Sequence, residues 1–353
     1  MSGKEDYARL RELLHGMPGG FPATESGVEM RILAKLFSPE DAETAVCLER
    51  EPLPPSEIAR RLGTGEAEAA ERLASMASRG LIYREGEGGE ARYRLEQFIV
   101  GIYEYNLGSM DRELAEMVEE YIPHIGLAMA GAETLQTRFV PVGSAVEVGH
   151  AVATHDHIRE LVRGHDTLGV KECICRKQQR LLGRGCHNPP EICLMFGDFA
   201  RYHLENGWPG RRIDVGEALR LLDRSEELGL VLLAENARDI RFVCSCCTCC
   251  CSGLRIMKAL PNPGEILHSN YRPLLDERSC DGCGACVERC PMEAVTVDSG
   301  SAAIELKRCI GCGLCVASCP RGAISLAQRE DFKAPPPDTR ETMRRILVER
   351  GII

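Results

Sequence analysis

Cysteine is the residue whose number and spacing point most directly to chemistry in this chain. The 353 residues include 19 cysteines: Cys47, ten between 173 and 251, and eight between 280 and 319. The opening residues, MSGKEDYARL, contain no apolar leader, so we expect a cytoplasmic protein. Reducing compartments keep thiols free, and closely spaced cysteines there indicate metal binding rather than disulfides. We therefore expect two metal-binding regions and assign no role to Cys47.

The eight C-terminal cysteines form a repeated pattern. CDGCGACVERCPMEAV (280–295) and CIGCGLCVASCPRGAI (309–324) align at an offset of 29 residues, with nine of 16 positions identical. Both read C-x2-C-x2-C-x3-C-P, which is the pattern of bacterial two-cluster ferredoxins. Zinc sites generally use pairs of cysteines rather than triplets, so zinc explains this pattern poorly.

The region 271–330 therefore resembles a two-cluster ferredoxin domain. The resemblance implies a βαββαβ arrangement and two [4Fe-4S] clusters, with the fourth cysteine of each half serving the cluster of the other half. VTVD and AAIEL, on either side of DSGS, predict a hairpin between the halves. The implied ligand sets are Cys280, Cys283, Cys286 and Cys319 for one cluster, and Cys309, Cys312, Cys315 and Cys290 for the other.

The stretch FVCSCCTCCCSG (242–253) is the densest group of thiols. Cys244, Cys247 and Cys250 are spaced C-x2-C-x2-C, and a second C-x2-C pair is interleaved with them. Neighbouring side chains point apart in both helix and strand, so one cubane cannot use all six cysteines of this stretch. KECICRKQQRLLGRGCHNPPEICLMF (171–196) supplies four more. The candidate ligands are Cys173, Cys175, Cys186, Cys193, Cys244, Cys246, Cys247, Cys249, Cys250 and Cys251.

These ten cysteines leave several arrangements open. One further [4Fe-4S] cluster is the leading interpretation, followed by two clusters or one larger cluster, with zinc or unligated cysteines as the less favoured alternative. Five cations near the first of these cysteines have four possible roles: to raise the cluster potential, to dock an acidic partner, to bind an anion, or only to form a solvated helix face. We expect His155, His157 and His187 to be ordinary histidines rather than ligands. The cations are Lys171, Arg176, Lys177, Arg180 and Arg184.

The N-terminal region contains a helix, turn, helix and hairpin pattern. Helices are expected near 56–62, with Ser56 as N-cap and Gly63 as terminator, and at 65–79; EGEGGE then turns a hairpin. This order resembles a winged helix-turn-helix domain. The second helix carries Glu66, Glu68 and Glu71, which phosphates would repel, so we favour protein docking or a structural role over DNA binding.

The whole chain reads as an α+β multidomain protein. We expect a winged-helix-like domain (1–100), a helical or extended connector (101–165), a mostly helical cysteine-rich region (166–270) that includes an amphipathic helix at 217–231, the ferredoxin domain (271–330) and a Pro linker with a C-terminal helix (331–353). This organisation is similar to multidomain ferredoxin-type proteins of anaerobes. The net charge of −10 argues against general nucleic-acid or membrane binding, and no apolar run is long enough for a membrane span.

The leading functional hypothesis is a soluble electron-transfer protein that relays single electrons to a partner oxidoreductase. No phosphate loop, dinucleotide fingerprint or nucleophile constellation is present, so a stand-alone enzyme is not favoured. Two alternatives are a redox-sensing transcription regulator that uses the winged-helix-like domain, and a reductase whose active site is the central cluster. The sequence leaves partner and oligomeric state open.

Overall fold

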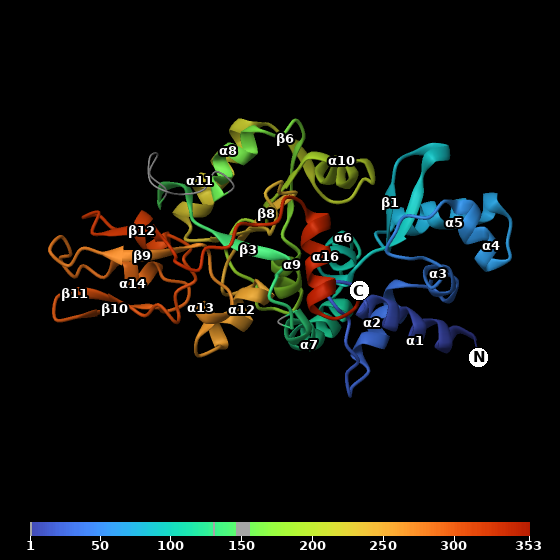
Figure 1. Ribbon diagram of the computed structural model, residues 1–353, viewed down its shortest axis with the longest axis horizontal. Coiled ribbons are helices and arrows are strands. Elements are labelled where there is room, and N and C mark those ends of the chain that lie inside the picture. Colours follow the sequence, from blue (N-terminus) through green and yellow to red (C-terminus); the bar gives the residue numbers. More distant parts are fainter. Residues whose placement is uncertain (1, 130, 146–155) are drawn as a thin grey trace.

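The elements follow one another along the long axis of the molecule. The computed structural model describes residues 2–129, 131–145 and 156–353. The N-terminal helices lie at one end, a large sheet lies in the middle and the C-terminal cysteine repeat lies at the other end (Figure 1). No helix among these described residues has the length and apolar character that a membrane crossing requires.

The N-terminal part is a group of helices closed by a hairpin. Hairpin strands β1 and β2 pair antiparallel, and Ala69, Leu73 and Met76 of α5 are buried in the core. The expected N-cap at Ser56 is wrong, because α4 begins at Pro55, whose ring favours the first helical position; Gly63 does end this helix in the left-handed conformation. The elements are α1 (Ser2–His15), α2 (Val28–Leu36), α3 (Pro39–Ala45), α4 (Pro55–Leu62), α5 (Glu66–Ser78), β1 (Ile82–Glu85), η1 (Gly88–Glu90) and β2 (Arg92–Leu95).

The segment expected as a connector contributes to the middle of the molecule. Its strand β3 pairs with β7 of the central sheet. His157 precedes α8, whereas His155 lies outside the described residues. The elements are η2 (Phe98–Ile102), α6 (Tyr103–Tyr105), α7 (Arg112–Met129), β3 (Thr137–Val140), η3 (Gly143–Ala145) and α8 (Ile158–Arg163).

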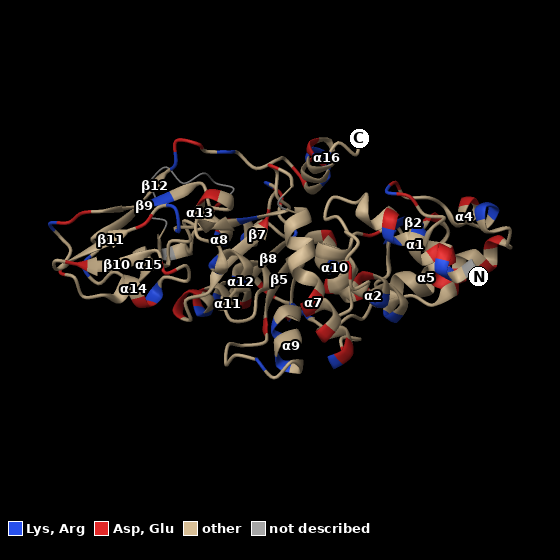
Figure 2. Ribbon diagram, turned by 90° about the horizontal axis from the view of Figure 1, so that it is seen from below, with Lys and Arg blue, Asp and Glu red and all other residues tan. Residues whose placement is uncertain are grey.

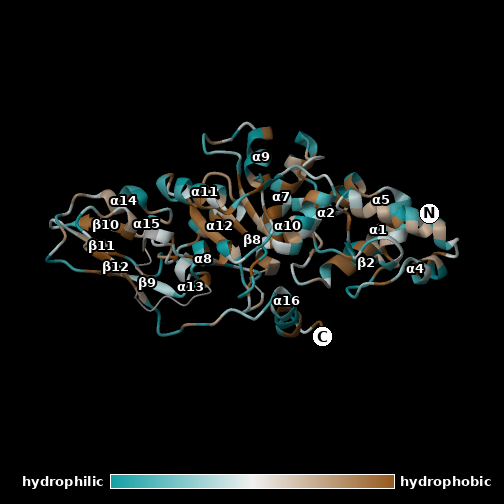
Figure 3. Cartoon of the chain, turned by 90° about the horizontal axis from the view of Figure 1, so that it is seen from above, coloured by the Kyte–Doolittle hydropathy of each residue, from teal (hydrophilic) through white to brown (hydrophobic). Residues whose placement is uncertain are grey.

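A six-stranded antiparallel sheet organises the central region, in the order β3-β7-β8-β5-β4-β6. The expectation of a mostly helical middle is therefore wrong. Strands β5, β7 and β8 of this sheet are largely apolar and almost entirely buried, without the alternation that marks a half-exposed strand; Figure 3 shows this hydrophobic centre. The amphipathic helix also ends earlier than expected, and Val231 already begins a strand. The strands are β4 (Leu168–Glu172), β5 (Glu191–Phe196), β6 (Arg211–Ile213), β7 (Val231–Glu235) and β8 (Phe242–Cys246).

Helices pack around this sheet and connect its strands. Helix α11 packs on α8, and α7 packs on both α9 and α12. The central helices are α9 (Ile174–Leu181), α10 (Gly197–Glu205), α11 (Val215–Glu227), α12 (Ser252–Ala259) and α13 (Pro263–Ile266).

The C-terminal repeat folds as two small antiparallel strand pairs with a short helix in each half. Strand β9 pairs with β12, and β10 with β11, so the hairpin expected around DSGS is present. The order of elements is strand, helix, strand, strand, helix, strand. The bounds are β9 (Tyr271–Leu275), α14 (Ala285–Arg289), β10 (Val295–Asp298), β11 (Ser301–Ile304), α15 (Leu314–Ala317) and β12 (Ile324–Gln328).

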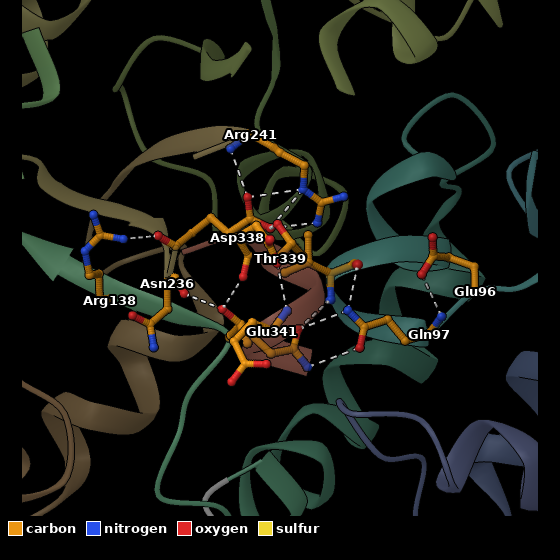
Figure 4. Close-up of polar contacts among 12 residues, drawn as sticks. Glu96, Gln97, Arg138, Asn236, Arg241, Asp338, Thr339 and Glu341 are labelled. Atoms are coloured by element: carbon orange, nitrogen blue, oxygen red, sulfur yellow. Dashed lines mark hydrogen bonds and ion pairs between the residues drawn. The ribbon is translucent and has the colours of Figure 1, made fainter. Parts of the chain in front are cut away.

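The last helix, α16 (Thr339–Glu349), returns to the middle of the molecule. The Thr339 hydroxyl donates to Glu235 at 2.8 Å, within the polar contacts drawn in Figure 4. The Thr342 hydroxyl donates to the carbonyl of Asn236, and Arg350 donates to the carbonyl of Pro18. The C-terminal helix thus joins the central sheet to the N-terminal helices.

Candidate metal centres

Two pockets in the C-terminal repeat collect its eight cysteines. In each pocket, the first three cysteines of one half meet the fourth cysteine of the other half. This is the crossed grouping that the ferredoxin resemblance implies. The first pocket is lined by Cys280, Cys283, Cys286 and Cys319, and the second by Cys290, Cys309, Cys312 and Cys315.

Backbone N–H groups point at the sulfurs of these pockets. Four Sγ atoms accept at 3.2–3.4 Å from the amides of Ala302, Ala294, Gly311 and Ala323. Hydrogen bonds from the N–H groups of Ala302 and Gly282 lower the pKa of Cys280. Donors of this kind stabilise thiolates, which is the state that binds iron. The donor set therefore fits iron–sulfur clusters.

Glycines make the tight turns of the pockets possible. Gly282 and Gly311 both have a backbone φ of +68°, which residues other than glycine rarely adopt. A Cβ at Gly311 would lie 2.3 Å from the carbonyl oxygen of Tyr271, and one at Gly282 would lie 2.6 Å from that of Gly300. Only glycine fits these two positions without displacing the neighbouring backbone.

Six of the ten central cysteines form a closed ring. Each of the six thiols shifts the pKa of its two neighbours, in the order Cys173, Cys175, Cys251, Cys246, Cys244, Cys193 and back to Cys173. The thiols come from the residue before α9 and the first turn of α9, from β5 and β8, and from the residue before α12. The neighbouring thiols of Cys193 and Cys246 lower the pKa of Cys244 to about 5.

The surroundings of the ring contain polar groups that fit a bound acceptor. Arg176 is 2 % exposed, its guanidinium faces Cys173 and Cys193, and its Nε has no partner within the described part of the chain. The Ser252 hydroxyl is likewise buried and unpartnered there. Buried donors are rarely left unpaired in folded proteins, so a group with acceptor atoms, such as the sulfides of a cluster, fits this place.

Two further residues that sequence reasoning missed lie beside the ring. The Tyr103 hydroxyl donates to the side-chain oxygen of Gln178, and burial, together with the nearby Cys175, raises the pKa of this tyrosine strongly. Burial also raises the pKa of Glu104 to about 7, against the hydrogen bond from Gly101 and the charge of Lys171. Neither residue belongs to a cysteine segment, so no spacing signal could have identified them.

The other four central cysteines form a compact site. Cys186, Cys247, Cys249 and Cys250 have Sγ atoms that all lie within 4.8 Å of one another. The Sγ of Cys186 lies 3.9 Å from that of Cys247 and 3.5 Å from that of Cys250. Burial alone would raise the pKa of Cys186, but the N–H of Asn188 and the thiols of Cys250 and Cys249 lower it to about 6.

The three kinds of site differ in how far apart their sulfur atoms lie. Among the residues that the structure describes, the compact site is the one group of three or more His, Cys, Asp or Glu ligands whose ligand atoms are all mutually within 4.8 Å. The sulfur atoms of the C-terminal pockets and of the ring are therefore spread further apart than those of the compact site. The C-x2-C-x2-C register of Cys244, Cys247 and Cys250 is not one site, because Cys244 belongs to the ring and the other two to the compact site.

The remaining predicted residues have simpler environments. Cys47 is half-buried and lies near the carbonyl of Glu43, remote from the other cysteines. His187 is exposed and is not part of the compact site. Of the basic cluster, Arg180 pairs with Glu172, Arg184 pairs with Glu119 and Lys177 donates to the carbonyl of Leu107. Each of these three cations has a partner, so they do not form a free basic surface.

Comparison with known proteins supports the C-terminal assignment. Residues 279–324 match the family model of the 4Fe-4S dicluster domain. Searches of curated proteins and of solved structures gave no match. The C-terminal repeat is therefore a ferredoxin-type iron–sulfur domain, and the cysteine-rich centre suggests further metal binding.

Proposed function

We propose that this protein is an iron–sulfur electron-transfer protein that relays single electrons between its C-terminal domain, its six-thiol ring and a partner oxidoreductase. The proposal includes two [4Fe-4S] clusters on the crossed cysteine sets and one further iron–sulfur centre in the ring. It also includes the domain boundaries given above, with a βαββαβ ferredoxin fold, a winged-helix-like N-terminal domain and action in an anaerobic cytoplasm.

The continuity of the core between the second pocket and the ring carries this proposal. Cys312 and Leu314 of the second pocket region belong to the same buried cluster as Cys246 and Cys251 of the ring. Cys286 of the first pocket and Cys315 of the second share another cluster. Iron–sulfur clusters in these places would supply reversible one-electron chemistry. The chain itself sets their order and joins their surroundings through shared buried clusters.

Arg308 fixes the C-terminal domain against the centre. Its guanidinium donates to the carbonyls of Met292, Leu260 and Pro261 at 3.0–3.2 Å. The adjacent Cys309 lines the second pocket, and Leu260 follows α12, whose first turn comes directly after ring member Cys251. This single side chain therefore joins the wall of the second pocket to the segment that supports the ring.

The N-terminal surface supports protein docking rather than DNA binding. Arg72 pairs with Glu68 and Arg79 pairs with Asp41, whereas Glu66 and Glu71 remain exposed. Figure 2 shows that charges of both signs lie on α4 and α5. A helix whose cations are already paired and whose first turn is acidic offers phosphates little attraction.

The experiment compares electron distribution in two matched variants. Protein purified without oxygen is mixed with dithionite, and freeze-quench EPR follows when the C-terminal and central signals appear. Arg308→Ala is expected to slow their equilibration, whereas Arg201→Ala, at an exposed ion pair with Asp198 on α10, is expected to leave it unchanged. Central and C-terminal signals that are reduced independently in the wild type would contradict the relay.

A cleft beside the ring favours a second candidate function, a reductase. This cleft of about 1040 Å³ is lined by Val100, Tyr105, Phe199 and Phe242, and Cys244 of the ring packs against the same aromatic cluster. A substrate in this cleft would be separated from Cys244 by this aromatic cluster. Cyanide added to the oxidised protein tests this candidate: a change confined to the central spectrum supports an open coordination position, and an unchanged spectrum argues for electron transfer alone.

A further inference from the structure

The sulfur atoms of the compact four-cysteine site lie closer together than those of the sites proposed for iron–sulfur clusters. In a zinc tetrathiolate, metal–sulfur bonds of about 2.3 Å and tetrahedral angles place the sulfurs about 3.8 Å apart. The observed Sγ separations of 3.9 Å between Cys186 and Cys247, and 3.5 Å between Cys186 and Cys250, agree with this value. A cubane holds each thiolate on a different iron, which separates the sulfurs further.

The C-terminal pockets provide an internal standard for this difference. Their cysteines line two pockets and are not grouped within the 4.8 Å limit that the compact site satisfies. The same chain thus shows two spacings of four cysteines. The wide spacing belongs to the region that matches a 4Fe-4S family, and the narrow spacing needs a different occupant.

The donors and the local charge also suit a single divalent ion. Cys247 and Cys250 form one C-x2-C pair, which is a usual half of a zinc site. Four thiolates with one Zn²⁺ leave a net charge of −2, and Arg176 donates to the Sγ of Cys247 at 3.9 Å. Asn188 donates to the Sγ of Cys186 at 3.5 Å. Such outer contacts orient thiolate ligands.

We propose that Cys186, Cys247, Cys249 and Cys250 bind one structural zinc ion in a tetrahedral site. The ion closes the loop after β8 onto the loop after α9. Residues 247–250 lie between Cys246 and Cys251, which are both members of the ring, so the zinc site also fixes the chain that carries two ring thiols. The proposal does not depend on electron transfer, because zinc has no redox chemistry.

The first test uses the wild-type protein. Metal analysis after purification without oxygen is expected to give about one zinc per chain in addition to iron. Zinc X-ray absorption is expected to show a single shell of four sulfurs at about 2.3 Å. A wild type that lacks zinc, or a zinc shell containing nitrogen or oxygen, would overturn the proposal. Because no substitution is involved, this test does not depend on the folding of a variant.

Variants then assign the zinc to this site. Cys186→Ala and Cys249→Ala are each expected to reduce bound zinc at least tenfold, and Cys47→Ala, at a cysteine remote from all sites, is expected to retain it. Zinc that persists in both variants contradicts the proposal. A loss of iron instead, either about four ions for a cubane or one ion for a single-iron site, also contradicts it. None of these outcomes decides whether the C-terminal domain transfers electrons.

Discussion

The C-terminal repeat and the central region both gather cysteines, but they do so by different means. In the C-terminal repeat, three cysteines of each site lie within seven consecutive residues, and the fourth comes from a symmetric copy. In the centre, the ring takes thiols from two strands, from helix α9 and from the residues that precede α9 and α12, and the cysteines of the compact site are interspersed with them in the sequence. Local spacing therefore specifies the first pair of sites, whereas the topology of the sheet specifies the others.

The largest expected effect tests the crossed grouping of the C-terminal cysteines. Cys319→Ala and Cys283→Ala should both remove the same cluster, with a loss of about four irons per chain, because both residues line the first pocket. Cys290→Ala should instead match Cys312→Ala, since these two line the second pocket. Iron analysis and EPR of each variant distinguish the two signals. If Cys319→Ala produced the Cys312→Ala spectrum, the crossed grouping would be wrong.

The second prediction tests whether the ring is one centre. If all six thiols bind one polynuclear cluster, each single alanine substitution should alter the same central signal and reduce the iron content by several atoms per chain. A cubane with two spectators would leave two of the six variants with the wild-type spectrum. Iron and sulfide analysis with Mössbauer spectroscopy provides the readout, and Cys47→Ala is the control. The variants start from Cys173, Cys175, Cys193, Cys244, Cys246 and Cys251.

The third prediction concerns the buried positive charge of Arg176, which lies among the central cysteines. Arg176→Met removes a cation that faces thiols of both the ring and the compact site and donates to the carbonyls of Pro189 and Ser245. We expect a loss of about 3–5 kcal/mol in the free energy of unfolding, because the buried thiolates lose their counter-charge.

Arg180→Met is the matched control, since its partly exposed ion pair with Glu172 contributes about 1 kcal/mol or less. Urea unfolding under anaerobic conditions measures both variants, and a redox titration of the central signal should show a lower potential for Arg176→Met. Equal stability losses in the two variants would contradict a special role for Arg176.

The sequence predicted those features that depend on local repetition. The C-terminal pockets follow from the repeated C-P motifs, and the hairpin at DSGS and helix α5 follow from short-range patterns. It did not predict the central sheet, because strands such as EICLMF are apolar after their first residue and resemble buried helix segments.

The division of the central cysteines required strand β8. Its two-residue period places Cys244 and Cys246 on one face, and the strand ends before Cys247 begins the next site. Assigning 242–246 as a strand would have separated Cys244 and Cys246 from the compact site, but not Cys251, which follows that site in the sequence and belongs to the ring. Arg176, by contrast, is one cation among five, and only packing shows which of them is buried between the sites.

The smallest effect concerns the part of the chain that has no metal site in our proposal. Burial raises the pKa of Asp41, but the hydrogen bonds from Arg79 and from the N–H of Ser38 lower it further, so that the net shift is downward. A lowered pKa in the folded state means that the ion pair stabilises the fold above pH about 3.8 and that this contribution is lost as the pH falls through the folded pKa.

Arg79→Ala should therefore cost about 1 kcal/mol at pH 7 and less at low pH, because Arg79 is itself partly exposed. Trp208 is a suitable reporter, since it is the one tryptophan of the chain and its indole donates to the carbonyl of Ser78 in α5 at 2.7 Å. Urea titrations followed by its fluorescence, with Arg60→Ala at an exposed ion pair as control, measure the effect. A stability cost that grew with acidity would show that metal release rather than this ion pair governs the N-terminal region, and the contrast between the regions would then disappear.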